Sequence, residues 1–278
     1  MKPRSTFVLL ALGFGYAFLY LPLALVVIYS FNASSLAAVW GGFSLRWYAE
    51  LLNSRDVLDA AWLSVRIAAV SATLASVLGT MAALALVRLG RFRGRTLFVG
   101  MLTAPLVMPE VITGLSLLLF FVSLQQLLGL VFARGAGTIA IAHVTFCTAY
   151  VAVVVQSRLS QLDASLEEAA MDLGGRPLGV LFDITLPIAT PAIAAGWLLA
   201  FTLSLDDLVI ASFVSGPGST TLPMLIFSKV RLGVTPDVNA LVTIMVLIVA
   251  AGVSIAGIAM QRREAERARS REQIGTAA

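Results

Sequence analysis

The sequence has few charged residues and few of the residue types that bind metals or form covalent intermediates. Only 12% of its 278 residues are charged, and it holds a single histidine and a single cysteine. One cysteine excludes an intramolecular disulfide. His143 and Cys147 lie one helical turn apart, but a soft-metal site needs more ligands than these two. We therefore predict that both side chains pack in the core and that the chain binds no metal.

Lysine is also scarce, which bears on the use of ATP. The only lysines are Lys2 and Lys229, and neither follows a glycine, so the phosphate-binding G-x-x-x-x-G-K loop is missing. The H-E-x-x-H and G-x-S-x-G motifs of hydrolases are missing too. Asp206 and Asp207 are adjacent and so point to different helix faces, which makes them a poor aspartyl dyad. We predict no enzyme activity, no catalytic residue and no cofactor in this chain.

Apolar residues make up 59% of the chain and the mean hydropathy is +0.94, which is typical of an integral membrane protein. Six segments are long enough, at about 20 residues each, to cross a bilayer. These predicted spans are 7–29, 60–87, 96–124, 138–156, 189–214 and 239–260. The first is too long for a signal peptide and no small-residue cleavage site follows it. We predict an all-α polytopic protein that forms a single domain, 1–278, because no linker divides it.

Basic residues are distributed unequally between the two sides of the membrane. With Lys2 inside, the cytoplasmic segments hold Lys2, Arg4, Arg88, Arg91, Arg93, Arg95, Arg158, Arg176, Arg262, Arg263, Arg267, Arg269 and Arg271. The outer segments hold Arg46, Arg55, Arg134, Lys229 and Arg231. This asymmetry predicts that both termini are cytoplasmic. The basic C-terminal tail is then a topology signal that also contacts anionic lipid, and we predict no nucleic-acid partner.

A polar segment, 158–188, separates the fourth and fifth spans. Ser165 followed by Glu168 predicts a capping box, and Gly174 predicts the end of a short helix. Leu166, Ala169, Ala170 and Leu173 share one face of that helix. Since a helix of about ten residues depends on packing for stability, this face should contact something. The contact is either the protein's own spans or a groove on a partner protein.

Carboxylates interrupt two of the predicted spans. Pro105 and Pro109 break the third span, and Glu110 lies at the break. Asp206 and Asp207 lie in the fifth span, where acidic residues are costly and indicate a function. Counting from the cytoplasmic ends, Asp206 lies about 25 Å along its span and Glu110 about 20 Å along its own. The acids are therefore predicted at similar depths in the outer half of the membrane.

These acids predict a pathway for a cation, whose charge would offset the cost of burying them. The aromatic rings of Trp197 and Phe201 could add cation–π attraction, or could simply pack in the core. An alternative explanation is structural. Arg66 lies inside the second span and should face the protein interior or a wet cavity with an acidic partner, so it could neutralise one of the acids.

The spacing within the polar segment resembles a known motif. Glu168-Ala169-Ala170, three residues, Gly174, nine residues and then Ile184-x-Leu186-Pro187 is similar to the cytoplasmic EAA loop of ATP-binding-cassette importer permeases. That resemblance implies a coupling helix, beginning at Ser165, that sits in a cleft of an ATPase subunit and transmits its closure to the spans. By this resemblance Glu168, Ala169, Ala170 and Gly174 carry the coupling role. Gly175 stands where alanine is usual, which predicts a looser turn.

Three further stretches, 103–116, 143–151 and 201–218, resemble bacterial polyamine importers and most of all their putrescine permeases. The likeness implies the MetI-like fold of binding-protein-dependent importer permeases in the bacterial inner membrane. It implies a homologous permease as heterodimer partner, two ATPase subunits that bind ATP and Mg²⁺, and a periplasmic polyamine-binding protein. The expected substrates are putrescine and spermidine, moved by alternating access. A permease for ferric iron or thiosulfate, or a secondary cation transporter, remains an alternative.

Overall fold

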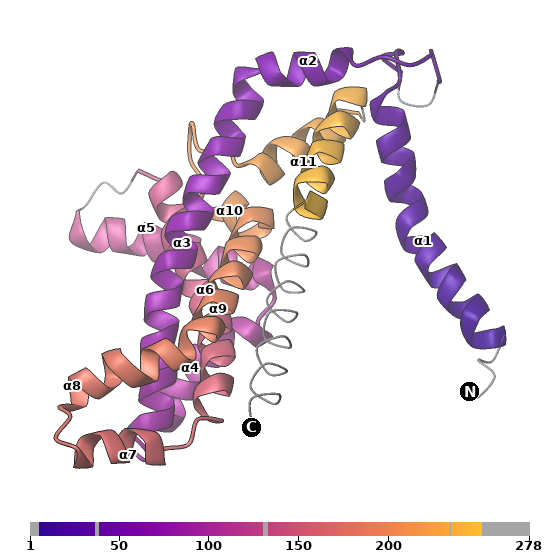
Figure 1. Ribbon diagram of the computed structural model, residues 1–278. Helices are drawn as coiled ribbons and strands as arrows, with labels where there is room; N and C mark the ends of the chain where they lie inside the picture. The colour runs from indigo at the N-terminus through magenta and orange to yellow at the C-terminus, as the bar shows by residue number, and fades with distance from the viewer. Residues whose placement is uncertain (1–5, 37–38, 130–132, 234, 252–278) are drawn as a thin grey trace. The chain divides into compact units, whose positions relative to one another are not determined.

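The computed structural model describes residues 6–36, 39–129, 133–233 and 235–251 (Figure 1). Every regular element in these ranges is helical, and one isolated antiparallel bridge joins Asn32 to Phe43. The helices are α1 (Thr6–Ser30), α2 (Arg46–Asn53), α3 (Arg55–Arg88), α4 (Arg95–Val107), α5 (Glu110–Leu128), α6 (Ala136–Leu159), α7 (Ser165–Asp172), α8 (Pro177–Val180), the π-helix η1 (Leu181–Thr185), α9 (Leu186–Asp206), α10 (Val209–Val214), α11 (Leu222–Leu232) and Pro236–Ala251.

The predicted all-α membrane fold is confirmed. By length and composition, five helices among the described residues could cross a membrane: Phe7–Ser30, Arg55–Arg88, Glu110–Leu128, Ala136–Leu159 and Pro177–Asp206. The predicted third span is divided into α4 and α5 at Pro109, whereas Pro105 lies inside α4 and does not break it. The predicted sixth span coincides in part with the shorter apolar helix Pro236–Ala251, and its last residues lie outside the described ranges.

The described residues fold into two compact units, one within 56–227 and the other made of those within 6–55 and 228–251. In the second unit, the loop after α1 is built around Asn32. Its side-chain amide donates to the carbonyl of Val39 at 2.7 Å, and its own carbonyl accepts the indole N–H of Trp47 at 2.7 Å. Lys229 Nζ and Asp237 Oδ2 form an ion pair at 2.6 Å. All the residues of the predicted functional segments lie in the first unit.

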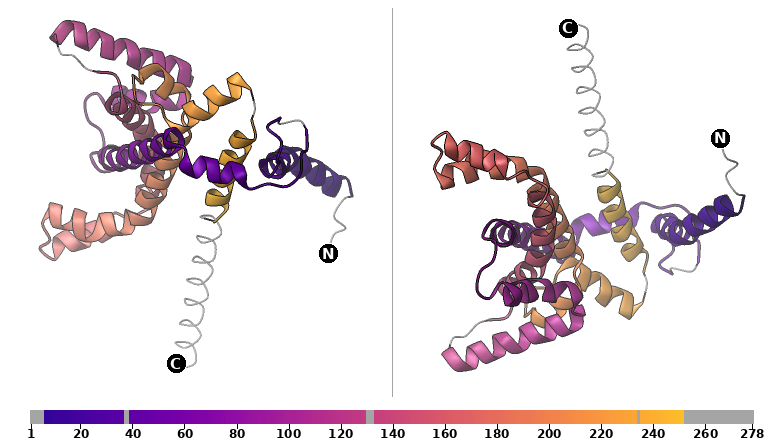
Figure 2. Two further views of the ribbon diagram at one scale, coloured as in Figure 1. Left: turned by 90° about the horizontal axis from the view of Figure 1, so that it is seen from above. Right: turned by 90° about the horizontal axis from the view of Figure 1, so that it is seen from below.

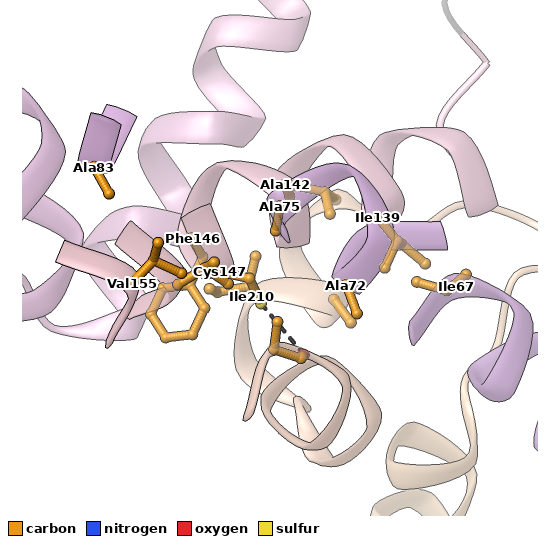
Figure 3. Close-up of a cluster of buried hydrophobic side chains, with 14 of the residues drawn as sticks. Ile67, Ala72, Ala75, Ala83, Ile139, Ala142, Phe146, Cys147, Val155 and Ile210 are labelled. Atoms are coloured by element: carbon orange, nitrogen blue, oxygen red, sulfur yellow. Dashed lines mark hydrogen bonds between the residues drawn. The ribbon is translucent and has the colours of Figure 1, made fainter. Parts of the chain in front are cut away.

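Three long helices, α3, α6 and α9, form the centre of the first unit, and they lie side by side in Figures 1 and 2. They approach closely because small residues line their contacts, which is how helices associate in a membrane. A Cβ atom on Gly79 of α3 would lie 2.8 Å from Cβ of Val151 on α6. A Cβ atom on Gly196 of α9 would lie 3.2 Å from Cγ1 of the same valine. Figure 3 shows the alanines and larger side chains of this core.

This packing predicts that Gly79→Ala destabilises the protein by about 1–3 kcal/mol, the usual cost of an added methyl group in a filled core. Gly100→Ala in α4 is the matched control, because no atom lies within 4 Å of the Cβ position there. Alanine is the better helix former, so the control should melt at or above the wild-type temperature. Thermal unfolding of the purified protein measures the difference. Equal melting temperatures for the two variants would contradict the close contact.

Candidate functional site

The short polar helix that the sequence predicts is α7, Ser165–Asp172, but its capping box is wrong. Ala164 precedes the helix, and no side chain caps it there. Ser165 already lies inside the first turn, so its hydroxyl is not at the capping position. The Asp163 carboxylate accepts the Ser165 N–H instead, at 3.0 Å. This hydrogen bond stabilises the charged form and holds the pKa of Asp163 below its ordinary value.

The end of α7 is a tight turn formed by two glycines. Gly174 has a φ of +88°, a left-handed conformation that glycine adopts without strain. The N–H of Gly175 donates to the carbonyl of Ala170 at 3.0 Å, and a Cβ atom on Gly175 would lie 2.6 Å from that same oxygen. Gly175 therefore closes the turn, which corrects the expectation that it loosens it.

The motif face of α7 is open to the surroundings in this chain. Glu168 and Ala169 are exposed, and the carboxylate of Glu168 makes no hydrogen bond or ion pair within the described residues. Leu166 is 51% exposed and Leu173 is 90% exposed. Leu166 and Leu173 therefore do not pack on the protein's own spans, which was one of the two contacts expected for this face. Glu168 is not used as a cap either.

The neighbouring carboxylate, Glu167, contacts the protein's own helices, which its sequence position did not reveal. Its Oε1 accepts from Nη2 of Arg88 at 2.9 Å and from Oγ1 of Thr185 at 2.7 Å. A basic residue at the inner end of the second span and a second glutamate beside Glu168 were the available signals. The sequence could not show that they meet, since 79 residues separate Arg88 from Glu167.

The break in the third span places Glu110 at a helix start. Met108 and Pro109 have extended backbones, with ψ of 135° and 137°, and they separate α4 from α5. Glu110 is the first residue of α5 and is exposed. The positive end of the helix dipole favours a carboxylate there. The predicted position of Glu110 at the break is confirmed, and the break is made by Pro109 alone.

The two adjacent aspartates have different surroundings. Helix α9 ends at Asp206, which is exposed. The side chain of Asp207 is only 6% exposed and lies before α10. Its Oδ2 accepts the N–H of Ala211 at 2.8 Å, and its Oδ1 accepts the N–H of Ile210 at 3.3 Å. Asp207 therefore caps α10, satisfying backbone donors that a membrane would otherwise leave unpaired.

His143 completes the contacts of Asp207. Its Nε2 lies 3.1 Å from Asp207 Oδ2, and its Nδ1 lies 2.6 Å from Ser204 Oγ. A carboxylate can only accept, so we assign the proton to Nε2, which leaves Nδ1 to accept from the serine hydroxyl. His143 is 1% exposed, as the packing prediction requires, but it also joins α6 to the junction between α9 and α10.

Cys147 is buried, and its Sγ donates to the carbonyl of Ala200 at 3.5 Å. No group of three potential metal ligands occurs in the part of the chain that the structure describes.

The two predicted aromatic residues stack on each other. The rings of Trp197 and Phe201 have centroids 5.3 Å apart and planes 13° apart. Both are half-buried against the core, and Nε1 of Trp197 donates to Oγ1 of Thr73 on α3 at 3.1 Å. Their packing role is therefore shown, and cation–π contact with a substrate stays a prediction.

Arg66 does not pair with any of the three acids within the described ranges. It lines an open cavity of about 530 Å³ together with Asp56, Asp59 and Trp62, all on α3. The predicted cavity is present, but the predicted acidic partner is not, because Arg66 forms no ion pair within the described residues. The alternative that it neutralises Glu110, Asp206 or Asp207 finds no ion pair to support it.

Comparison with known proteins decides the family. The family model described as "Binding-protein-dependent transport system inner membrane component" matches residues 75–268. The chain belongs to this family. The permease is 62% identical over 245 residues to the Escherichia coli K12 protein "Putrescine transport system permease protein PotI", covering 88% of this chain and 87% of that one. It is 43% identical over 224 residues to the K12 "Spermidine/putrescine transport system permease protein PotC", covering 81% and 82%.

Solved structures confirm the fold of the permease. A crystal structure of a bacterial ABC transporter that imports alginate matches with a TM-score of 0.71 at 18% identity, covering 92% of this chain and 98% of that one. An inward-facing MetNI methionine transporter matches with a TM-score of 0.60 at 15% identity, covering 79% and 98%. The permease is thus an inner membrane component of an importer, as the EAA spacing predicted.

Proposed function

We propose that this permease subunit moves putrescine, and also spermidine, across the bacterial inner membrane by alternating access. The names of the two relatives support a polyamine as substrate. The observation that carries the proposal is the exposure of Glu110 and Asp206, each at a helix break. A polyamine is a flexible chain with an ammonium group at each end, and separate carboxylates can bind the two ends in turn.

The arrangement of charges favours Asp206 over Asp207 as a substrate contact. Asp207 already accepts three hydrogen bonds from His143, Ile210 and Ala211. Asp206 is exposed, and forms no ion pair within the described residues, so its charge is available to a passing ammonium group. We assign substrate contact to Glu110 and Asp206 and a structural role to Asp207. Trp197 and Phe201 then flank the pathway as a stacked pair.

The energy for transport is assigned to other subunits. This chain has no phosphate-binding loop, and α7 exposes the face that carries Glu168 and Ala169. We propose that this face docks on one of two ATPase subunits, which bind ATP and Mg²⁺. Both termini of the permease are then cytoplasmic. A homologous permease completes the pathway, and a periplasmic binding protein delivers the substrate. An alginate transporter of the same fold was solved in complex with its periplasmic protein. Differential binding of these partners to the inward- and outward-facing states drives the cycle.

Uptake by the complete reconstituted complex tests the proposed function. Labelled putrescine should enter vesicles only when ATP is supplied on the ATPase side. Unlabelled spermidine should compete, whereas thiosulfate and ferric iron should not. Uptake that follows a proton gradient without ATP would instead identify a secondary transporter. Competition by ferric iron or thiosulfate alone would identify a different substrate.

A further inference from the structure

We propose that Arg88, Glu167 and Thr185 form a polar link that transmits the movement of α7 to α3 and α9. This inference rests on the proposed coupling to an ATPase. The EAA residues Glu168 and Ala169 lie on the exposed face of α7. The link lies on the opposite face, which packs on the rest of the subunit, and includes neither of them. Arg88 and Glu167 act here as positioning residues for transport.

One carboxylate oxygen joins three elements. Oε1 of Glu167 accepts from Nε of Arg88 at 3.1 Å, from Nη2 of Arg88 at 2.9 Å and from Oγ1 of Thr185 at 2.7 Å. The side chains of Arg88 and Glu167 are 26% and 16% exposed, and Thr185 is 3% exposed. This is the one ion pair that α7 makes in the described parts of the chain. Charge-assisted hydrogen bonds of this kind are about twice as strong as neutral ones.

The link lies in apolar surroundings, which strengthens it. Arg88, Glu167 and Thr185 line a groove of about 600 Å³ between α3, α7, α8 and η1. Its other lining residues are apolar: Met81, Leu84, Ala85, Leu89, Met171, Pro177, Leu178, Val180 and Leu181. Ionic attraction is greater where water is partly excluded. Removal of either charge would therefore leave the other unpaired in an unfavourable environment.

The connectivity of these elements indicates what the link transmits. Arg88 is the last residue of α3, and Figure 1 shows α7 and α8 at this end of α3. Thr185 is the last residue of η1, which continues into α9 at Leu186 without a break. Helix α9 then extends about 30 Å to Asp206 at its other end. A π-helical segment inside a longer helix is frequently a functional site. A displacement of α7 would thus pull on α3 and on the helix that carries Asp206.

The two adjacent glutamates therefore have separate tasks. Successive residues on a helix point in different directions and do not share a face. Glu168 points outward without a partner in the described residues, while Glu167 points inward to Arg88 and Thr185. In this arrangement Glu168 contacts the ATPase, and Glu167 holds α7 to the spans.

Charge reversal in the full complex tests the link. Arg88→Glu and Glu167→Arg should each lower putrescine uptake per ATP hydrolysed by roughly tenfold, because like charges replace the ion pair. The double variant Arg88→Glu with Glu167→Arg restores the pair in reverse and should recover most of that ratio. Arg91→Glu is the matched control. It also reverses a charge in the inner loop, but Arg91 is exposed and makes no ion pair in the described ranges, so its ratio should stay near the wild-type value.

Two further variants keep the test decisive if charge reversal blocks assembly of the complex. Glu167→Gln keeps the shape and removes the charge, and Thr185→Val removes only the hydroxyl donor, so each should lower the ratio by a smaller factor. Restored assembly in the double variant would also support the pair. Normal ratios in both single reversals, or a double variant no better than the singles in an assembled complex, would overturn the inference. If the wild-type complex hydrolyses ATP but imports no polyamine, the proposed substrate is wrong. The link is then tested by comparing, in wild type and variants, how much the loaded binding protein stimulates ATP hydrolysis.

Discussion

Replacing Glu168 by glutamine and Gly174 by alanine in one chain is expected to lower putrescine uptake on the order of 10- to 100-fold, the range of typical coupling energies. ATP hydrolysis should continue, since we propose that the ATPase is a separate subunit, but it should no longer move the spans. Glu168 is exposed and has no partner among the described residues, so its replacement should cost little stability. Gly174 has a φ of +88°, where alanine is strained by roughly 1–2 kcal/mol.

The control for backbone strain is Gly94→Ala. Gly94 has a φ of +86°, and neither it nor Gly174 has an atom within 4 Å of its Cβ position. The two substitutions therefore introduce the same strain at different turns. Loss of uptake in Gly174→Ala but not in Gly94→Ala would show that transport depends on the turn after α7 and not on backbone strain in general. Membrane fractionation measures insertion, and normal uptake by the double variant would count against docking through α7.

The second large effect is expected at Asp206, where substitution should lower uptake, whereas substitution of Asp207 should lower stability. Asp206→Asn should lower the initial rate of uptake at low putrescine concentration by roughly 10- to 100-fold, the value of one charge-assisted hydrogen bond. The melting temperature should not change, because Asp206 is exposed and forms no ion pair in the described structure. Glu110→Gln should behave in the same way. Uptake at the wild-type rate in both variants would show that these acids do not contact the substrate.

Asp207→Ala should instead destabilise the protein. It removes the cap of α10, worth about 1 kcal/mol, and leaves the buried N–H of His143 without an acceptor, at a cost of about 1–3 kcal/mol. Thermal unfolding measures this loss. Asp183→Asn is the control for thermal unfolding only, because Asp183 is an exposed carboxylate. A stable Asp207→Ala variant with low uptake would reverse the assignment of the two residues.

The parts of the fold that follow from the membrane itself could be predicted from sequence. A bilayer demands long apolar helices, so hydropathy located α1, α3 and α6. Proline lacks an N–H, and Pro109 therefore predicted the break before Glu110. The polar segment 158–188 could be found because the spacing of its motif is local to one stretch of chain.

The features that depend on tertiary contacts could not be predicted. Nothing in the sequence around Asp206 shows that α9 ends there and that Asp207 turns inward to His143. The pairing of Arg88 with Glu167 depends on how α3 lies against α7. The capping box failed for a local reason, since the Asp163 carboxylate accepts the Ser165 N–H that Glu168 would accept in a capping box.

The contact of α3, α6 and α9 at Val151 also limits how this subunit can move. Gly79 leaves no room for a methyl group beside that valine, and at Gly196 a methyl group would be in tight contact with it. A helix that slid by even one residue would bring a larger side chain into the same space. These three helices are therefore expected to pivot together as a rigid body, and the passage for polyamines would open by rocking of that body against its neighbours.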